Sequence, residues 1–237
     1  INFFTIGLFF FYIFQKKKSS ERQHPFAYGW FYGFGFFLTN LYWITISLTF
    51  DESFYFLLPL ALILIPSFLA LFYGLATYFF FLIKVKKPVS NFFLFSLLFG
   101  LTEFLRGNIL TGFPWNLIAY SFSENIEILQ IISFTGTYGF NVLCISFFSS
   151  PAIFIIRENR KEIFVCIFLL LSPIILYSIG SSKIKSFQSI NISNNEYVIR
   201  VIGSKIDLDR FYGNSNTADV IEELIEISQP DLNTKTI

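Results

Sequence analysis

The sequence predicts a mainly α fold: a polytopic transmembrane helical bundle followed by the start of an α/β domain. Hydrophobic residues make up 54% of the 237 residues and charged residues 14%, whereas soluble domains carry roughly 25% charged residues. The hydrophobic residues also fall in long blocks, which is typical of membrane helices. The composition changes after Gly180, where a soluble portion is expected to begin. The net charge of +1 gives no indication of a nucleic-acid partner.

Six hydrophobic runs predict about six membrane helices. A helical span needs roughly 20 residues, so the shorter first run is interpreted as the tail of a helix, and we expect the protein to begin before Ile1. The third run, with Pro59 and Pro66 near its start, is long enough to span with tilt or to begin as a broken helix, and Gly136 and Gly139 predict an early break in the fifth run. The runs are Ile1–Phe14, Phe26–Phe50, Phe54–Ile83, Val89–Leu105, Ile126–Ile156 and Ile163–Ile179.

The second run combines small and aromatic residues. Gly29, Gly33 and Gly35 are small enough to let helix backbones approach closely within a membrane. Tyr42 and Trp43 are residue types that anchor helices at the membrane interface, although they lie well inside the run.

Basic residues are concentrated in three alternate loops, which hold four, three and three Lys or Arg. The intervening loops hold none near Asp51 and only Arg106 between the fourth and fifth runs. Because basic loops stay in the cytoplasm, this pattern places the Arg106 segment and everything after Gly180 on the outer side. The basic loops contain Lys16–Lys18 with Arg22, Lys84–Lys87, and Arg157–Lys161.

The residues after Gly180 predict a linker, then a strand at Tyr197–Ile202 and an amphipathic helix at Thr217–Ser228. Strand, loop and helix in this order open an α/β domain. Such a short soluble segment cannot bury a stable core, so we expect the protein to continue beyond Ile237. The predicted domains are a transmembrane domain over residues 1–180, a linker over 181–196 and a truncated soluble domain over 197–237.

The most informative stretch is Glu103–Tyr120. Glu103 and Arg106 are three residues apart and share a helix face. They could form an ion pair that ends the span, or Arg106 could bind a lipid phosphate through its fork of donors. Trp115 is likewise either an ordinary interfacial residue or, with Tyr120, part of a wall that holds an acyl chain. The residue pattern leaves both pairs of alternatives open.

Cys144 and Cys166 lie inside hydrophobic runs and are interpreted as small buried side chains. His24 is the only histidine, in a polar loop, and no Ser/His/Asp arrangement can be built around it. We therefore expect no metal and no cofactor.

Several segments resemble the bacterial apolipoprotein N-acyltransferases. E-F-L-R-G and T-G-F-P-W within Glu103–Trp115 are similar to that family's E-W-L-R-G…T-G-F-P-W signature. Gly33–Ser47 resembles its G-x-G-F-F…L-Y-W segment, and Gly136–Gly139 matches its G-x-Y-G. The resemblance covers nearly the whole chain, but Gly203-Ser204-Lys205 departs from the Gln-x-Asn-like turn of the family.

The resemblance implies a multi-pass protein of the bacterial inner membrane with a periplasmic nitrilase-like domain. It implies transfer of an acyl chain from a phospholipid, through a cysteine thioester, to the diacylglyceryl-cysteine of an apolipoprotein. The catalytic Glu, Lys and Cys are expected beyond Ile237, so no residue here is assigned as catalytic, and these 237 residues alone are not expected to catalyse the reaction. The candidate lipid- or substrate-groove residues are Glu103, Arg106, Pro114, Trp115, Tyr120, Tyr42 and Trp43.

Two alternatives remain: a transporter or channel, and a non-catalytic membrane remnant. A transporter should carry ionisable residues in the middle of its helices, and the hydrophobic runs between residues 26 and 101 have none. The coding sequence beyond Ile237 would distinguish an enzyme from a remnant.

Overall fold

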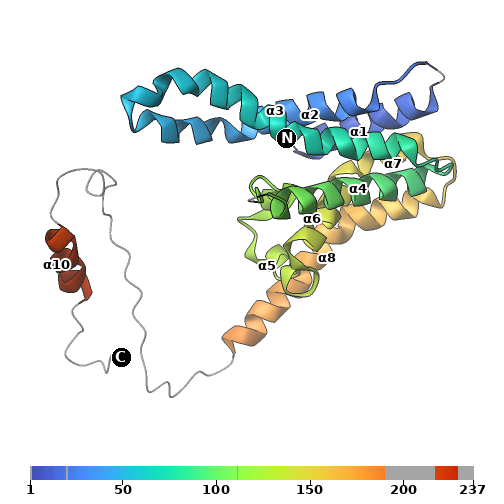
Figure 1. Ribbon diagram of the computed structural model, residues 1–237. Helices are drawn as coiled ribbons and strands as arrows, with labels where there is room; N and C mark the ends of the chain where they lie inside the picture. Colours follow the sequence, from blue (N-terminus) through green and yellow to red (C-terminus); the bar gives the residue numbers. More distant parts are fainter. Residues whose placement is uncertain (1, 20, 111, 190–216, 229–237) are drawn as a thin grey trace. The chain divides into compact units, whose positions relative to one another are not determined.

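The computed structural model describes residues 2–19, 21–110, 112–189 and 217–228. The chain divides into two compact units, residues 1–186 and 187–237. The described residues form helices and no strands, so the mainly α prediction is confirmed for this part of the chain (Figure 1).

Each of the six hydrophobic runs contains one long helix. Four stretches are long and apolar enough to cross a membrane: Pro25–Thr49, Glu52–Leu82, Pro88–Asn108 and Glu162–Gln188. The helices in the other two runs are shorter, with 17 and 18 residues. The long helices are α1 (Asn2–Lys18), α2 (Pro25–Leu41), α3 (Leu58–Leu82), α4 (Pro88–Asn108), α6 (Ile132–Ser149) and α8 (Glu162–Gln188).

The sequence suggested that the second run forms one continuous α-helix, but the structure shows two helical segments of different type. The α-helix α2 ends at Leu41 and a 3₁₀-helix, η1 (Tyr42–Thr49), takes its place. In η1 the hydroxyls of Thr45, Ser47 and Thr49 each donate to the carbonyl three residues earlier, at 2.6–2.7 Å. Such side-chain bonds compete with the α-helical pattern, and β-branched residues add to the preference against it.

A second 3₁₀-helix, η2 (Glu52–Leu57), precedes α3 and contacts η1. Asp51 begins it by accepting hydrogen bonds from the backbone N–H and hydroxyl of Ser53, at 2.9 and 2.7 Å. These bonds lower the pKa of Asp51, as expected for a carboxylate that caps a helix N-terminus. The third run therefore begins with a 3₁₀ segment, one of the two arrangements that its sequence allowed, but α3 continues through Pro66 without a break.

The fifth run is divided into α5 (Ile126–Leu129), α6 and α7 (Pro151–Ile156). Gly136 interrupts the helical path with φ 67° and ψ 170°. This left-handed φ favours glycine, so the predicted break at Gly136 is confirmed. A short 3₁₀-helix, η3 (Ile118–Phe122), lies before α5.

Helices α2 and α3 pack closely through glycine. A Cβ on Gly29 would lie 2.1 Å from the carbonyl oxygen of Tyr73, and one on Gly33 would lie 3.1 Å from the Cα of Ala70. Gly35, in contrast, faces open space. The expectation of close helix approach therefore holds for two of the three glycines.

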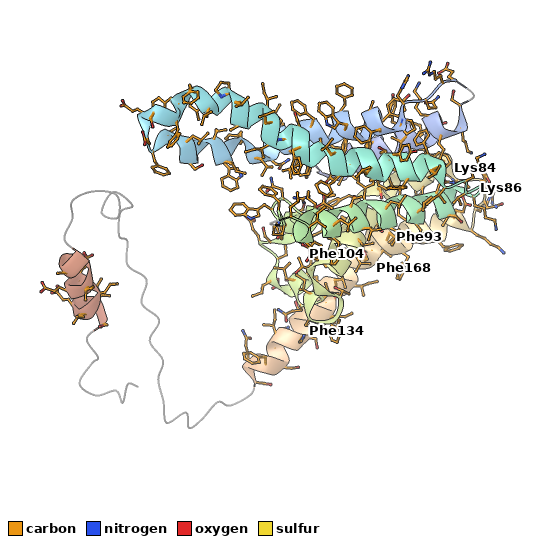
Figure 2. The ribbon with its side chains drawn as sticks, viewed as in Figure 1. Lys84, Lys86, Phe93, Phe104, Phe134 and Phe168 are labelled. Carbon is orange, nitrogen blue, oxygen red and sulfur yellow. The ribbon has the colours of Figure 1, made fainter. Side chains whose placement is uncertain are left out.

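Phenylalanine fills the bundle core and also covers its outside. Phe10, Phe92 and Phe95 are fully buried, with the ring centroids of Phe10 and Phe95 4.9 Å apart. Figure 2 shows other side chains on the outer surface of the helices, and the labelled Phe93 and Phe168 are 50% and 65% exposed. A broad exposed apolar surface of this kind suits contact with lipid rather than water.

The three basic loops lie at the same end of the bundle, where the α1–α2, α3–α4 and α7–α8 connections meet (Figure 1). Lys17 Nζ lies 2.8 Å from the carbonyl oxygen of Ile83, and Lys18 Nζ lies 3.4 Å from Glu158 Oε1. This grouping is the arrangement that the alternating charge pattern requires.

Helix α8 continues further than the sequence suggested. Residues 181–188, expected to open a linker, form its last turns and end at Gln188. This segment contains no Pro or Gly after Gly180, so nothing in it terminates the helix. The predicted strand Tyr197–Ile202 lies outside the described residues. In the second unit, α10 (Thr217–Ser228) has the bounds that its sequence predicted.

Candidate functional site

The last turns of α4 carry a buried ion pair. Glu103 is 0% exposed and Arg106 1% exposed, and Arg106 Nη2 donates to Glu103 Oε2. The other carboxylate oxygen accepts a 2.5 Å hydrogen bond from the hydroxyl of Tyr73 on α3. Buried charges are tolerated where they are paired and hydrogen-bonded, and this pair meets both conditions.

Arg106 also holds the turn that follows α4. Its Nη1 donates to the carbonyl oxygens of Phe113 and Trp115, at 2.5 and 2.9 Å. The backbone N–H of Phe113 returns a 2.9 Å hydrogen bond to the Arg106 carbonyl. Gly112 allows the reversal with φ +75°, and a Cβ there would lie 2.6 Å from the carbonyl oxygen of Gly107. One guanidinium therefore fixes the turn at residues 112–115 against the helix end.

This turn contacts the junction between α2 and η1. The rings of Trp43 and Trp115 stack with centroids 5.1 Å apart and an interplanar angle of 20°. Asn116 Nδ2 and Trp43 Nε1 both donate to the carbonyl oxygen of Asn40, each at 3.0 Å. The unwinding of the helix at Tyr42 thus places an indole ring where the turn can stack on it.

Two apolar cavities share Phe113 in their lining. One of about 400 Å³ lies between α3 and the end of α4, and Arg106 and Phe72 are among its lining residues. The other, of about 460 Å³, includes Trp43 and Trp115 in its lining. Ile44 and Phe113 line both, so we refer to the two cavities together as the aromatic groove.

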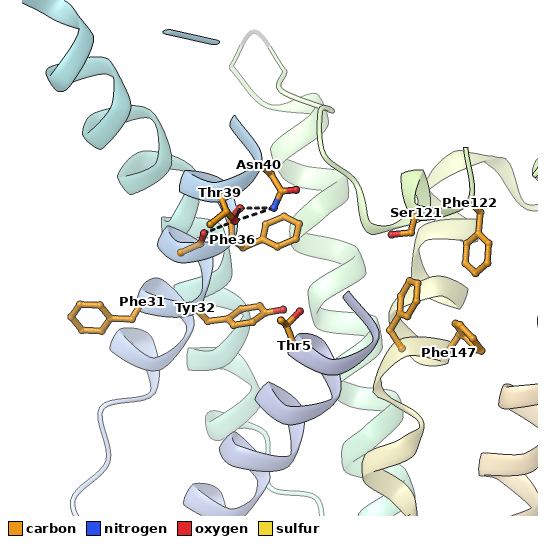
Figure 3. A pocket seen from close by; sticks show the side chains of 11 residues that line it. Thr5, Phe31, Tyr32, Phe36, Thr39, Asn40, Ser121, Phe122 and Phe147 are labelled. Atoms are coloured by element: carbon orange, nitrogen blue, oxygen red, sulfur yellow. Dashed lines mark hydrogen bonds between the residues drawn. The ribbon is translucent and has the colours of Figure 1, made fainter. Parts of the chain in front are cut away.

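A third cavity, of about 870 Å³, lies beside α1, α2, η3 and α6. Figure 3 shows Tyr32 pointing toward Thr5 on one side of it, with Phe122 and Phe147 on the other. Asn40 also lines this cavity. The Asn40 carbonyl also accepts the hydrogen bond from Asn116, the residue after the turn, so Asn40 connects the lining of the third cavity to the segment beside the aromatic groove.

The structure brings most of the predicted site residues together around this turn. The hydroxyl of Tyr120 donates to the carbonyl oxygen of Pro114 at 3.2 Å. Partial burial raises the pKa of Tyr120, so its hydroxyl, which is already protonated at neutral pH, remains a donor further into the alkaline range. Tyr42 is 61% exposed and is not among the residues that line the three cavities described above.

Three residues of the site were not singled out in the sequence. Tyr73 lies within a long apolar run, and only its helical register against α4 brings it to Glu103. Phe113 lies in the stretch Glu103–Tyr120 but was not among the candidate groove residues, and Asn40 contributes through its backbone carbonyl. A carbonyl partner leaves no signature in residue type, so only tertiary structure could identify it.

The surroundings of the two cysteines indicate a structural role. Cys144 and Cys166 are both buried, and Cys166 Sγ donates to the carbonyl oxygen of Ser150 at 3.2 Å. Among the described residues there is no group of three or more His, Cys, Asp or Glu side chains that could hold a metal ion.

The fold and the groove define an integral membrane protein, with apolar cavities beside a turn anchored by a buried ion pair. Residues 1–150 match the sequence model of the apolipoprotein N-acyltransferase N-terminal domain. The chain therefore belongs to the apolipoprotein N-acyltransferase family, an acyltransferase family of lipoprotein biosynthesis, as its motifs indicated.

Relatives named apolipoprotein N-acyltransferase match most of the chain. The protein from Rhodopseudomonas palustris is 30% identical over 213 residues, covering 88% of this chain and 39% of the relative. The Brucella melitensis protein is 30% identical over 203 residues, covering 85% and 37%. The Rickettsia prowazekii protein is 36% identical over 182 residues, covering 74% and 36%. The matched segments thus span less than two fifths of the length of these curated relatives.

Proposed function

We propose that this chain forms the membrane portion of an apolipoprotein N-acyltransferase. In the reaction, a cysteine thiolate attacks the ester carbonyl of a phospholipid, giving an acyl thioester and a lysophospholipid. The α-amine of a lipoprotein's diacylglyceryl-cysteine then attacks the thioester, giving an amide and regenerating the thiol. By the family resemblance, the catalytic Glu, Lys and Cys are not among these 237 residues, and the membrane portion presents the lipid substrates.

The observation that carries this proposal is the aromatic groove beside the turn at residues 112–115. Its lining is predominantly apolar, as an acyl chain requires, and it includes Arg106. Nη1 and Nη2 of Arg106 are bound to the turn and to Glu103, whereas Nε is buried with no hydrogen-bond partner among the described residues. Because Arg106 is 1% exposed, a lipid ester carbonyl or phosphate oxygen would give this donor an acceptor only when the groove opens to admit it. Arg106 would then hold the turn and orient the lipid at once.

We place the groove on the periplasmic side of the bacterial inner membrane. Helix α4 begins beside Lys87 in a basic loop and ends at Asn108 beside the groove. Its 21 residues correspond to about 30 Å of helix, which is the thickness of a bilayer core. Basic loops face the cytoplasm, so the groove would face outward. Helix α8 likewise begins beside a basic loop and would carry the C-terminal segment to the outer side.

A chimera tests the proposal. The chain up to residue 196 would be joined to the following part of the Rickettsia prowazekii relative, with that relative's own membrane portion as the positive control. We expect the chimera to transfer a labelled acyl chain from phospholipid to a diacylglyceryl-cysteine peptide. A membrane-inserted, folded chimera that forms neither thioester nor amide product would contradict the proposed function.

A further inference from the structure

A separate cavity lies at the basic end of the bundle, far from the aromatic groove along α4. It has a volume of about 310 Å³, and we call it the lysine pocket. Its lining comes from the ends of α1 and α3, the α3–α4 connection and the start of α4. The lining residues that matter here are Lys17, Lys18, Lys84, Lys86, Asn91 and Phe81.

Hydrogen bonds hold the Lys17 side chain in a fixed position in this pocket. Its ammonium donates to the carbonyl oxygens of Phe80 and Ile83 and to Asn91 Oδ1, at 2.6, 2.8 and 2.9 Å. These bonds use all three of its protons and place a cation at the C-terminal end of α3, where the helix dipole favours it. Asn91 Nδ2 in turn donates to the Val85 carbonyl at 2.9 Å, which holds the connection in place.

Two of the remaining three lysines are free to bind a ligand. Lys84 and Lys86 are exposed and form no ion pair with a described residue, whereas Lys18 pairs with the exposed Glu158 at 3.4 Å and lies 4.8 Å from the centroid of the Phe14 ring. No carboxylate is among the described residues that line the pocket. Four ammonium groups around one cavity repel one another, and an anion in the cavity would relieve this repulsion.

We propose that the lysine pocket binds the phosphate group of an anionic membrane phospholipid. The pocket lies where two candidate spans end and begin, at Leu82 and Pro88, which is the depth of lipid headgroups. Basic pockets between membrane helices are suited to phosphate headgroups.

A lipid fits this site better than a soluble anion because apolar surface adjoins the lysines. Phe81 lines the pocket itself. Leu82 and Phe93 on the neighbouring turns of α3 and α4 are 60% and 50% exposed, so acyl chains can cover them while the phosphate contacts the lysines. A bound headgroup would link α1 to the α3–α4 connection, and this role does not depend on acyl transfer.

The test compares lipid retention by the whole 237-residue chain in detergent, measured by native mass spectrometry with phosphatidylglycerol and phosphatidylcholine. The variant Lys84→Gln/Lys86→Gln removes two pocket lysines. The matched control Lys16→Gln/Lys87→Gln removes the same charge from the same basic end of the bundle, one residue at the end of α1 and one beside α4, and both lie outside the pocket lining. We expect wild type to prefer phosphatidylglycerol, the pocket variant to bind it at least about tenfold more weakly, and the control to change by less than about threefold.

Two further arms separate folding and the source of phosphate. The conservative variant Lys84→Arg/Lys86→Arg should keep the charge and retain phosphatidylglycerol, which shows that the loop tolerates substitution. Inorganic phosphate alone should raise the melting temperature much less than phosphatidylglycerol does. Equal retention of both lipids by wild type, equal loss in the pocket and control variants, or an equal temperature shift with inorganic phosphate would each overturn the proposal.

Discussion

The indole rings of Trp43 and Trp115 stack with their centroids 5.1 Å apart, joining the start of η1 to the turn that follows α4. Each ring belongs to the lining of the aromatic groove. Trp115 is 50% exposed and Trp43 38%, so the stack leaves part of both ring surfaces open to a ligand. The pair therefore couples the shape of the groove to the position of the turn.

Replacing Trp115 with Ala in an active chimera should impair acyl transfer or lipid binding more than expression. The substitution removes part of the groove wall and a ring contact of about 0.5–1.5 kcal/mol. Acyl transfer and the amount of membrane-inserted protein would be measured together. Trp30→Phe is a control, because Trp30 is not among the residues lining the groove. Full activity of both Trp115→Ala and Arg106→Ala would remove the support for a lipid-binding role here.

Breaking the Glu103–Arg106 pair on one side should destabilise the bundle strongly. Glu103→Gln leaves the buried guanidinium without its counter-charge, which typically costs about 3–5 kcal/mol. The double variant Glu103→Gln/Arg106→Met leaves no unpaired buried charge, so this contribution to its loss of unfolding free energy should be smaller. It still loses the hydrogen bonds from Arg106 to the turn. The free energy of unfolding in mixed micelles would measure both variants.

The exposed pair Lys18–Glu158 provides the comparison for this measurement. Glu158→Gln removes a partner from an ion pair whose side chains are 50% and 53% exposed. Exposed pairs contribute about 0–1 kcal/mol, so this variant should unfold almost as wild type does. Similar losses in Glu103→Gln and Glu158→Gln would contradict the assigned burial of the central pair.

Tyr73→Phe should weaken the same network without leaving a large cavity. The substitution removes only the hydroxyl that donates to Glu103 Oε1 at 2.5 Å. A hydrogen bond to a charged group contributes about 1.5–3 kcal/mol, and we expect a loss within that range. The control Tyr78→Phe changes an exposed tyrosine on the same helix and should leave the unfolding free energy nearly unchanged.

The sequence predicted the helical runs, the break at Gly136, the bounds of α10 and the grouping of basic loops, because these depend on local composition and spacing. It also put Glu103 and Arg106 within reach of each other, since their separation fixes their relation on a helix. It did not predict that Tyr73 binds Glu103, because that contact depends on the register between α3 and α4.

The change from α2 to η1 shows the same limit at the backbone level. Apolar residues on both sides of Tyr42 suggested one helix, whereas the hydroxyls of Thr45 and Ser47 bond carbonyls three residues back. That change of pitch brings Trp43 onto Trp115. The site was therefore predictable as a set of residues around residues 103–120, but its contacts with α2 and η1 were not.

Gly29→Ala and Gly35→Ala should affect stability in opposite directions. A methyl group on Gly29 would meet the Tyr73 carbonyl at 2.1 Å, forcing α2 and α3 apart, whereas Gly35 has nothing within 4 Å. Alanine in a helix interior is favoured over glycine by about 1 kcal/mol, so Gly35→Ala should be neutral or stabilising. Melting temperatures in one detergent would compare the two variants. A stabilising Gly29→Ala would show that the helices do not approach there as described.

Lys17→Met should destabilise the bundle, in contrast to the pocket variant Lys84→Gln/Lys86→Gln. Methionine retains much of the apolar stem but leaves the Phe80 and Ile83 carbonyls and Asn91 Oδ1 without their shared donor. We expect a loss of about 2 kcal/mol in unfolding free energy, because each charged donor bond is strong but this site is partly hydrated. Substitution of Lys84 and Lys86 should weaken lipid retention but leave the stability in lipid-free detergent nearly unchanged. If Lys17→Met and the pocket variant were equally stable, then Lys17 would have no special structural role, and the pocket would depend on all of its lysines alike.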